Sequence, residues 1–503
     1  MGDQNSILTA AEARHLLRRT GFGAPPKAVA KILKAGRTRG EAVDELLKFK
    51  PKKFQPGGKH KDSSLRESHD LWLLFMLKVK SALQEKLVLF WHDHFATSDA
   101  KVGSAFLMAA QNARLRAFCK GNFKDFVKAM NRDAATMEFL DTVRNRKHTP
   151  NENYGRELQE LFTLGVKDFT ASPGVDNYTQ EDIVQIARAF TGWDYDDRGV
   201  AFFDDNRHDY MADFPGRGPK VIYQSTGGFG PGGRSFTVNG EGEAEIDTVI
   251  DIIFDHTDSA GNPTVARRTA SRLLEYFAHS NPDVTIADAV VATSSFDTQF
   301  NIASLVRAIL VHDSFYDSMA AAPFTASTKK SVKWPIDYVI GTLRMLGVRL
   351  YGRDQILEGG SYNSLLTHLD NMGQVLLDPP SVFGWDWETA WISSATLLAR
   401  AGFARDATSA RGRSGTSFKS EKLKTTTGGY IIDLSDAGDI VDAVTTLLGV
   451  DDQLTSAERT VLVDYVSDNG ANTTLDLHDY ATRQSKLHGL FALVLQSPAY
   501  QVH

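Results

Sequence analysis

Residues 65–95 constrain the fold of this chain more than any other stretch. A helix through them carries apolar side chains on every side, among them Trp72, Phe75, Met76, Phe90 and Trp91. A helix that is apolar all round is buried in a core, because no face of it favours water. We therefore expect residues 65–95 to form a helix at the centre of a large body, in contact with the helix that follows residue 150.

Apolar residues recur at helical spacing along most of the rest of the chain. This spacing predicts further helices at about 103–117, 123–140, 244–256, 263–279, 300–311, 328–346, 363–376 and 389–403. Thr9 and Thr179 are placed to cap helices, and Thr149, followed by Pro150 and Glu152, has the pattern of a capping box.

Residues 193–243 differ, because aromatic and β-branched residues stand there between Asp and Gly clusters, which indicates short strands or ordered loops. The predicted fold is therefore mainly α: a multi-helix body with a small β/loop excursion around 193–243.

Changes in composition divide the 503 residues into five parts, which we expect to pack as one compact body. Residues 1–64 hold N-terminal helices and a basic loop that begins at Lys48, and 65–192 form a central helical core. Residues 193–243 are the β/loop excursion, and 244–407 form a second helical part. Residues 408–503 begin with a Ser-, Thr- and Gly-rich stretch to Gly429, predicted as a mobile loop, before the C-terminal helices.

Charge and cysteine content exclude several classes of protein. With 56 basic and 62 acidic residues the net charge is −6, which disfavours nucleic acid as a partner. The single cysteine, Cys119, excludes an internal disulfide and multi-cysteine metal sites. The longest strongly apolar run, Leu71 to Leu77, is far shorter than the ~20 residues of a membrane span. Residues 1–6 show no secretory signal.

Residues 149–162 hold the leading candidates for catalysis. In the predicted helix Asn153, Glu157 and Glu160 form a polar stripe beside an apolar face. Glu157 lies nearest the buried face, where burial raises a carboxyl pKa and suits a general acid, while Glu160 in a wetter setting could act as base or nucleophile. Ordinary ion pairs with Arg156 are the structural alternative.

His92 and His94 end the most apolar helix. Residues two apart on a helix point about 200° apart, so this pair cannot chelate one metal ion unless the backbone is extended. A metal site would need remote ligands such as Asp141, Glu157 or His208, and we assign no metal and no cofactor. Core histidines with satisfied ring nitrogens are the structural alternative.

Two further groups contain candidate ligands. Arg188 and Trp193 close one helix, and residues 204–209 concentrate acidic side chains with His208 and Asp209, as in a loop cation site or a solvated turn. Trp385 follows a rigid Pro-Pro pair, and a tryptophan beside carboxylates suits a sugar ring, although core packing explains it equally well. Gly228 to Gly233 fits G-x-G-x-x-G, but a β-like segment follows it, so we do not predict a dinucleotide site.

These segments together resemble the DUF1800 family, a mainly bacterial domain of unknown function. The residues that carry the resemblance are 16–23 (LLRRTGFG), 90–95 (FWHDHF), 150–153 (PNEN), 156–158 (REL), 160–165 (ELFTLG), 187–193 (ARAFTGW), 379–380 (PP) and 384–385 (GW). Gly155 departs from the family's alanine, and residues 48–64 and 408–429 look peculiar to this chain. The resemblance implies a bacterial source and, for many relatives, export and a sulfatase-like partner protein.

The leading interpretation is an extracytoplasmic enzyme, periplasmic or secreted, that cleaves a polysaccharide. Glu157 would be the acid, and Asp141, Glu160 or Asp209 the second carboxylate. We expect His92, Glu157 and either His208 or Asp209 to converge on one pocket, with Trp193 or Trp385 on its wall. The alternatives are a non-enzymatic partner or scaffold protein and a metal-dependent enzyme that uses His92, His94 and carboxylates.

Overall fold

The apolar segment 65–95 is buried as predicted, but it forms two helices rather than one. These are α4 (Leu65–Lys78) and α5 (Ala82–His94). Arg344 causes the break, because its guanidinium donates to the backbone oxygens of Met76, Leu77 and Val79 and so satisfies the carbonyls at the end of α4. This cap comes from a distant part of the chain and has no local sequence signal.

The computed structural model describes residues 4–51, 64–168, 174–210, 218–236, 241–319, 330–350, 365–410, 416–472 and 474–503. Most of the predicted basic loop at 48–64 lies outside them.

The first helices are α1 (Ala10–Thr20), α2 (Pro26–Ile32) and α3 (Arg39–Leu47). After α5 come α6 (Asp99–Val102), α7 (Ala105–Phe118), α8 (Phe123–Met130), α9 (Ala134–Phe139), η1 (Thr142–Arg144), α10 (Asn153–Glu157), the π-helical turn η2 (Leu158–Thr163) and α11 (Gln180–Ala189).

Where the structure describes it, the excursion at 193–243 contains short antiparallel strands, which confirms the predicted short strands. Strand β1 (Trp193–Tyr195) pairs with β2 (Ala201–Phe203), with Trp193 opposite Phe203. After η3 (Asp205–Arg207), β3 (Val221–Ile222) pairs with β4 (Arg234–Ser235). A third pair, β5 (Arg349–Leu350) with β6 (Thr416–Ser417), lies outside the excursion.

The rest of the chain is helical. Its second part comprises η5 (Gly242–Ala244), α12 (Glu245–Phe254), α13 (Thr264–Phe277), α14 (Val284–Ser294), α15 (Phe296–Gln299), α16 (Ile302–Val311), α17 (Asp313–Tyr316), η6 (Asp317–Met319), α18 (Pro335–Met345), α20 (Leu365–Asn371), η7 (Glu388–Trp391) and α21 (Ser394–Ala407). The C-terminal part comprises η8 (Ser420–Lys422), η9 (Ile431–Asp433), α22 (Ala437–Leu448), α23 (Ser456–Ser467), α24 (Tyr480–Thr482), η10 (Arg483–His488), α25 (Gly489–Gln496) and α26 (Pro498–Gln501). The mainly α prediction is confirmed.

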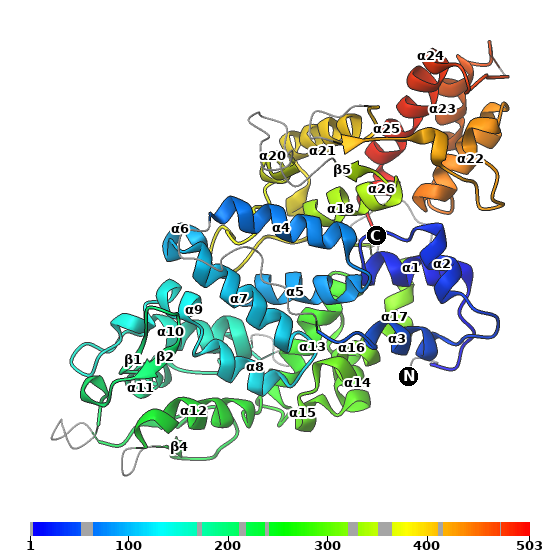
Figure 1. Cartoon of the computed structure of the whole chain (residues 1–503). Helices are drawn as coiled ribbons and strands as arrows, with labels where there is room; N and C mark the ends of the chain where they lie inside the picture. The colour runs from blue at the N-terminus through cyan, green and yellow to red at the C-terminus, as the bar shows by residue number, and fades with distance from the viewer. Residues whose placement is uncertain are drawn as a thin grey trace.

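Figure 1 shows α5 near the middle, with α4 on one side and α7 and α13 on the other. The β1–β4 excursion lies at one end of the molecule and helices α22–α24 at the other, while the C-terminus lies between α1 and α18. The buried apolar side chains form one continuous core that extends from Leu8 to Tyr500. The predicted division into five parts stays a prediction.

The predicted packing of the central helices is confirmed. Trp72 and Phe90 are buried, and the ring of Phe162 in η2 lies 5.2 Å from that of Phe95, just beyond α5. Thr9 and Thr179 each form a complete capping box, with Glu12 and Asp182.

Three local predictions are wrong. Thr149 does not cap a helix, since α10 begins only at Asn153, whose backbone N–H donates to the Asn151 side chain at 2.9 Å. The single helix expected at 123–140 is split, because the Asp133 side chain caps α9. The expected mobile loop at 408–429 is packed where described, because Phe418 is buried and the Ser420 hydroxyl lies 2.7 Å from Nε2 of His488.

Candidate acid–base site

The end of α5 lies against the π-helical turn η2. Nε2 of His94 donates to the backbone oxygen of Phe162 at 3.1 Å. Within η2 the backbone N–H groups of Leu164 and Gly165 both reach the carbonyl of Gln159 at 2.9 Å. The turn is therefore wider than an α-helix, and π-helical turns are frequent at functional sites.

Glu157 lies just before this turn and Glu160 lies within it, and the two carboxyl groups have different surroundings. Glu157 is 9% exposed, and burial raises its pKa, as does the neighbouring Glu160 charge, while Arg156 opposes the shift. Glu160 is half-buried, and its carboxylate accepts a hydrogen bond from the Tyr178 hydroxyl at 3.1 Å. The pair thus places one carboxyl that favours its proton beside one that accepts a hydrogen bond.

Arg268 of α13 ties its helix to the turn. Its guanidinium donates to the backbone oxygen of Glu160 at 2.9 Å. This approach requires the glycine at 165, whose φ is +80° and where an added Cβ would lie 2.5 Å from Nη1 of Arg268. Burial lowers the pKa of Arg268 to about 10, and the Glu160 carboxylate partly offsets that shift.

Asp93, near the end of α5, adjoins this group through Arg272 of α13. Its carboxylate accepts from the backbone N–H of Trp385 at 2.7 Å and from the Trp387 indole at 3.0 Å. An Arg272 nitrogen lies 3.8 Å away, too far for a hydrogen bond. Burial raises the pKa of Asp93 to about 7 against these stabilising contacts. Arg272 also pairs with Glu275 at 3.3 Å, and burial raises the pKa of Glu275.

These residues form one continuous group, which we call the acid–base cluster. Its members are Asp93, Glu157, Glu160, Tyr178, Arg268, Arg272 and Glu275. Sequence reasoning found Glu157 and Glu160 and missed the other five. Two signals were present: a carboxyl inside an otherwise apolar helix, and charged residues at 268, 272 and 275, a spacing that repeats on one face of a helix.

His92 and His94 point to different places, as their spacing indicates. Nε2 of His92 accepts the Leu377 backbone N–H at 3.0 Å, and burial lowers the pKa of both imidazoles to about 3. Among the described residues no group of three or more His, Cys, Asp or Glu side chains is arranged to hold a metal ion.

His208 and Asp209 do not meet Glu157 and instead belong to a separate buried ionic group. Asp209 lies 3.3 Å from the Arg188 guanidinium, and Nε2 of His208 lies 3.1 Å from the Glu245 carboxylate, which also binds Lys220. All five side chains are buried, so His208 and Asp209 are not in a solvated turn. Neither His208 nor Asp209 therefore joins His92 and Glu157 in one pocket as expected, because the charges of His208 and Asp209 pair within this separate group.

The remaining candidates lie at the periphery. Asp141 pairs with Lys101 and Arg144, each at 2.8 Å. Arg156 pairs with Glu152 at 3.4 Å and donates to Gln180 at 2.9 Å, and Asn153 is half-buried at the start of α10. Of the three possible partners for Glu157, only Glu160 lies in the acid–base cluster.

Both candidate tryptophans are buried. Trp193 and Trp385 are each 3% exposed, so neither ring lines an open wall as expected. The half-buried aromatic beside the cluster is Trp387, whose ring lies 4.2 Å from the Arg272 guanidinium. The loop that holds it approaches Asp93 closely because residue 384 is glycine at φ +82°.

A cavity of about 500 Å³ lies beside Asn177, the residue before Tyr178. Its lining includes Asp168, Asn177, Thr226, Ser259 and the glycine-rich segment at 227–230. That segment leads into β4 rather than a helix, as the β-like sequence after it predicted. Hydroxyl, amide and carboxylate groups of this kind suit a polyhydroxylated ligand.

The fold and this cluster define a mainly helical protein with a partly buried group of carboxyl and guanidinium side chains at its centre. Residues 15–502 match the model of the DUF1800 family, described as a protein of unknown function, and the chain belongs to that family. No curated protein and no solved structure matches the chain. No helix among the described residues is long and apolar enough to cross a membrane.

Proposed function

We propose that this chain is a bacterial enzyme that cleaves a polysaccharide by acid–base chemistry, with Glu157 as the general acid and Glu160 as the second carboxylate. The observation that carries the proposal is the contrast between the two carboxyls. Burial and the Glu160 charge raise the pKa of Glu157, whereas Glu160 accepts the Tyr178 hydrogen bond and lies near Arg268. Glycosidases use two carboxyl groups in different environments, one as the acid and the other as the base or nucleophile.

In this proposal Glu157 gives its proton to the glycosidic oxygen as the bond to the anomeric carbon breaks. Glu160 either removes a proton from the attacking water or attacks the anomeric carbon itself. In the second case water, deprotonated by Glu157, then breaks the bond between Glu160 and the sugar. Tyr178 and Arg268 hold Glu160 in place. The cavity beside Asn177 supports a sugar chain as the ligand, because its lining is rich in hydrogen-bonding groups.

The proposal places the enzyme in the periplasm or outside the cell, where polysaccharide is available and where a sulfatase-like protein would be its partner. Both points rest on the family resemblance of the chain.

Glu157→Gln tests the assignment. We expect turnover of a cleaved polysaccharide, measured as new reducing ends, to fall roughly 10²–10⁴-fold. The melting temperature should stay at or above that of the parent, since Gln removes a carboxyl that is costly to ionise. Glu152→Gln is the matched control, because Glu152 lies one turn away in surface pairs with Arg156 and Gln180. Unchanged turnover in Glu157→Gln would remove Glu157 from the mechanism.

A non-enzymatic partner protein is the second candidate. The burial of Trp193 and Trp385 favours it, because both rings serve the core rather than an open cleft. It predicts that a panel of neutral, acidic and sulfated polysaccharides yields no new reducing ends with the parent protein, whereas cleavage of any of them excludes it.

A further inference from the structure

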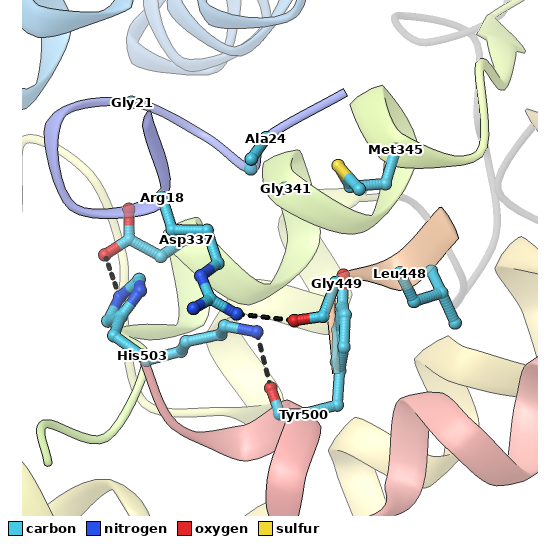
Figure 2. Close-up of a pocket in the computed structure, with 12 residues that line it drawn as sticks. Arg18, Gly21, Ala24, Asp337, Gly341, Met345, Leu448, Gly449, Tyr500 and His503 are labelled. Atoms are coloured by element: carbon cyan, nitrogen blue, oxygen red, sulfur yellow. Dashed lines mark hydrogen bonds and ion pairs between the residues drawn. The ribbon is translucent and has the colours of Figure 1, made fainter. Parts of the chain in front are cut away.

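Another group of buried charged side chains, distinct from the acid–base cluster and from the group around His208, surrounds a small cavity. Figure 2 shows it between α1, α18 and the last residues of the chain. The cavity measures about 20 Å³, and its lining includes Arg18, Lys333, Asp337, Tyr500 and His503. All five side chains are less than 10% exposed. This volume holds one particle about the size of a water molecule.

Among the described residues, neither of the two cations that face this cavity forms an ion pair with a carboxylate. The Lys333 ammonium donates to the backbone oxygen of Tyr500 at 2.6 Å and lies 3.6 Å from the centre of its ring. The Arg18 guanidinium donates to the backbone oxygen of Gly449, while its Nε has no hydrogen-bond partner among the described residues. Both contacts are with neutral groups. The carboxylates of Asp451 and Asp452 act on Arg18 from a distance, and that of Asp337 acts on Lys333, but they offset only part of the cost of burying the two charges.

The carboxylate in the lining is already paired. Both oxygens of Asp337 accept from the Lys86 ammonium, at 2.8 and 2.7 Å, and Nε2 of His503 lies 3.5 Å away. Burial alone would raise the pKa of Asp337, but Lys86 and His503 outweigh it and lower the pKa to about 2. The negative charge of Asp337 is thus engaged by the Lys86 ammonium, and its effect on Lys333 does not outweigh burial.

Two neighbouring arginines are likewise held by neutral acceptors. Arg19 donates to the backbone oxygens of Phe277 and Tyr276, and Arg400 donates to that of Lys333 and to the Gln501 side chain. Burial and the Arg18 charge lower the pKa of Lys333 well below its usual range. Buried charge that is only partly compensated is costly, so a small anion between Arg18 and Lys333 would stabilise the folded chain.

We infer that this cavity is a binding site for a single chloride-sized anion, held by Arg18 and Lys333 and required for full stability. The size of the cavity selects a monoatomic halide, since sulfate and phosphate are too large for it. The site is structural and independent of the proposed acid–base chemistry.

Thermal unfolding of the full chain in sodium chloride and in sodium gluconate at equal ionic strength tests this site. Because chloride would bind only the folded state, the melting temperature should rise with chloride and then saturate, by roughly 2–4 °C. Bromide should replace chloride, and sulfate should not. Equal melting temperatures in chloride and gluconate would show that the cavity holds water or that Lys333 is neutral, and either result overturns the inference.

Lys333→Met should abolish the chloride response. Lys120→Met is the matched control, because Lys120 makes the same two contacts elsewhere: its ammonium donates to the Leu47 backbone oxygen at 2.7 Å and lies 4.4 Å from the Phe49 ring centre. This control should keep the full response, and an unchanged response in Lys333→Met contradicts the site. If Lys333→Met does not fold, crystals of the parent grown in bromide decide, because an anomalous peak between Arg18 and Lys333 is expected and its absence overturns the inference.

Discussion

The pKa of the buried Asp93 carboxyl depends on the groups around it. It lies on the most apolar helix, and loss of water raises its pKa to about 7 although two N–H groups donate to it. The folded state therefore keeps a proton that the unfolded chain releases near pH 4. As the pH rises from about 4 to about 7, this residue contributes progressively less to the free energy of unfolding.

Asp93→Asn should flatten the pH dependence of stability in that interval. Asn has no proton to lose, while its side-chain oxygen still accepts from the Trp385 backbone. Denaturant unfolding at steps from pH 4 to pH 8 measures the slope. Asp386→Asn, at an exposed carboxyl of the same loop, should keep the parental slope. The same slope in Asp93→Asn would show that Asp93 is ionised throughout.

Gly384→Ala should be strongly destabilising. Residue 384 combines a φ of +82° with backbone contact to Asp93, whose Oδ1 would lie 2.3 Å from the new methyl group. Gly373→Ala is the matched control, since its φ is +89° but the nearest side-chain atom would be 3.8 Å away. We expect about 1–2 kcal/mol for the control and clearly more for Gly384→Ala, measured by chemical unfolding. Equal losses would mean that the loop can move away from Asp93.

At the scale of elements, two threonines with similar sequence surroundings have different roles. The Thr179 hydroxyl accepts a hydrogen bond from the Asp182 backbone N–H, and the Asp182 carboxylate accepts one from the Thr179 backbone N–H, which completes the box at the start of α11. Thr149 instead pairs with Arg146 in a turn, and Asn145 and Asn151 organise the chain before α10.

Thr179→Ala should cost about 1 kcal/mol of stability through loss of this cap. Thr149→Ala should cost less, because no helix depends on its side chain. Urea unfolding of the two variants gives the comparison directly. A larger loss at Thr149 would contradict the start of α10 at Asn153.

At the scale of the molecule, the C-terminal residues connect distant helices. Gln501 accepts from Arg400 of α21 at 3.0 Å and donates to the Leu495 backbone oxygen of α25 at 2.8 Å, and the Lys333 N–H donates to its carbonyl at 2.8 Å. These bonds join α21, α25 and the segment that leads into α18 (Figure 1).

Gln501→Ala should lower the free energy of unfolding by about 1–3 kcal/mol, because it leaves the buried Arg400 guanidinium without one acceptor. Gln496→Ala is the control, since the Gln496 side chain donates only within its own helix, to Ala492. Guanidinium unfolding followed by tryptophan fluorescence measures both. A cost at Gln501 no greater than at Gln496 would show that Arg400 finds another partner.

Local patterns in the sequence determined the fold class, most helices and two of the three caps, because helix formation depends on residues three and four positions apart. The burial of Trp72 and Phe90 followed from the same rule. The helices at 284–294 and 134–139 were missed as separate elements, since alanine, serine and threonine give their boundaries little contrast.

Only the tertiary structure decided which residues surround the candidate acid–base pair. Glu157 and Glu160 were visible in the sequence, but their neighbours Asp93, Tyr178 and Arg268 come from three other segments and meet through packing at Gly165 and Gly384. The same is true of the break capped by Arg344 and of the separate grouping of His208 and Asp209. Each of these features depends on which buried charged groups come into contact. Those contacts join residues tens to hundreds of positions apart, so no local sequence pattern encodes them.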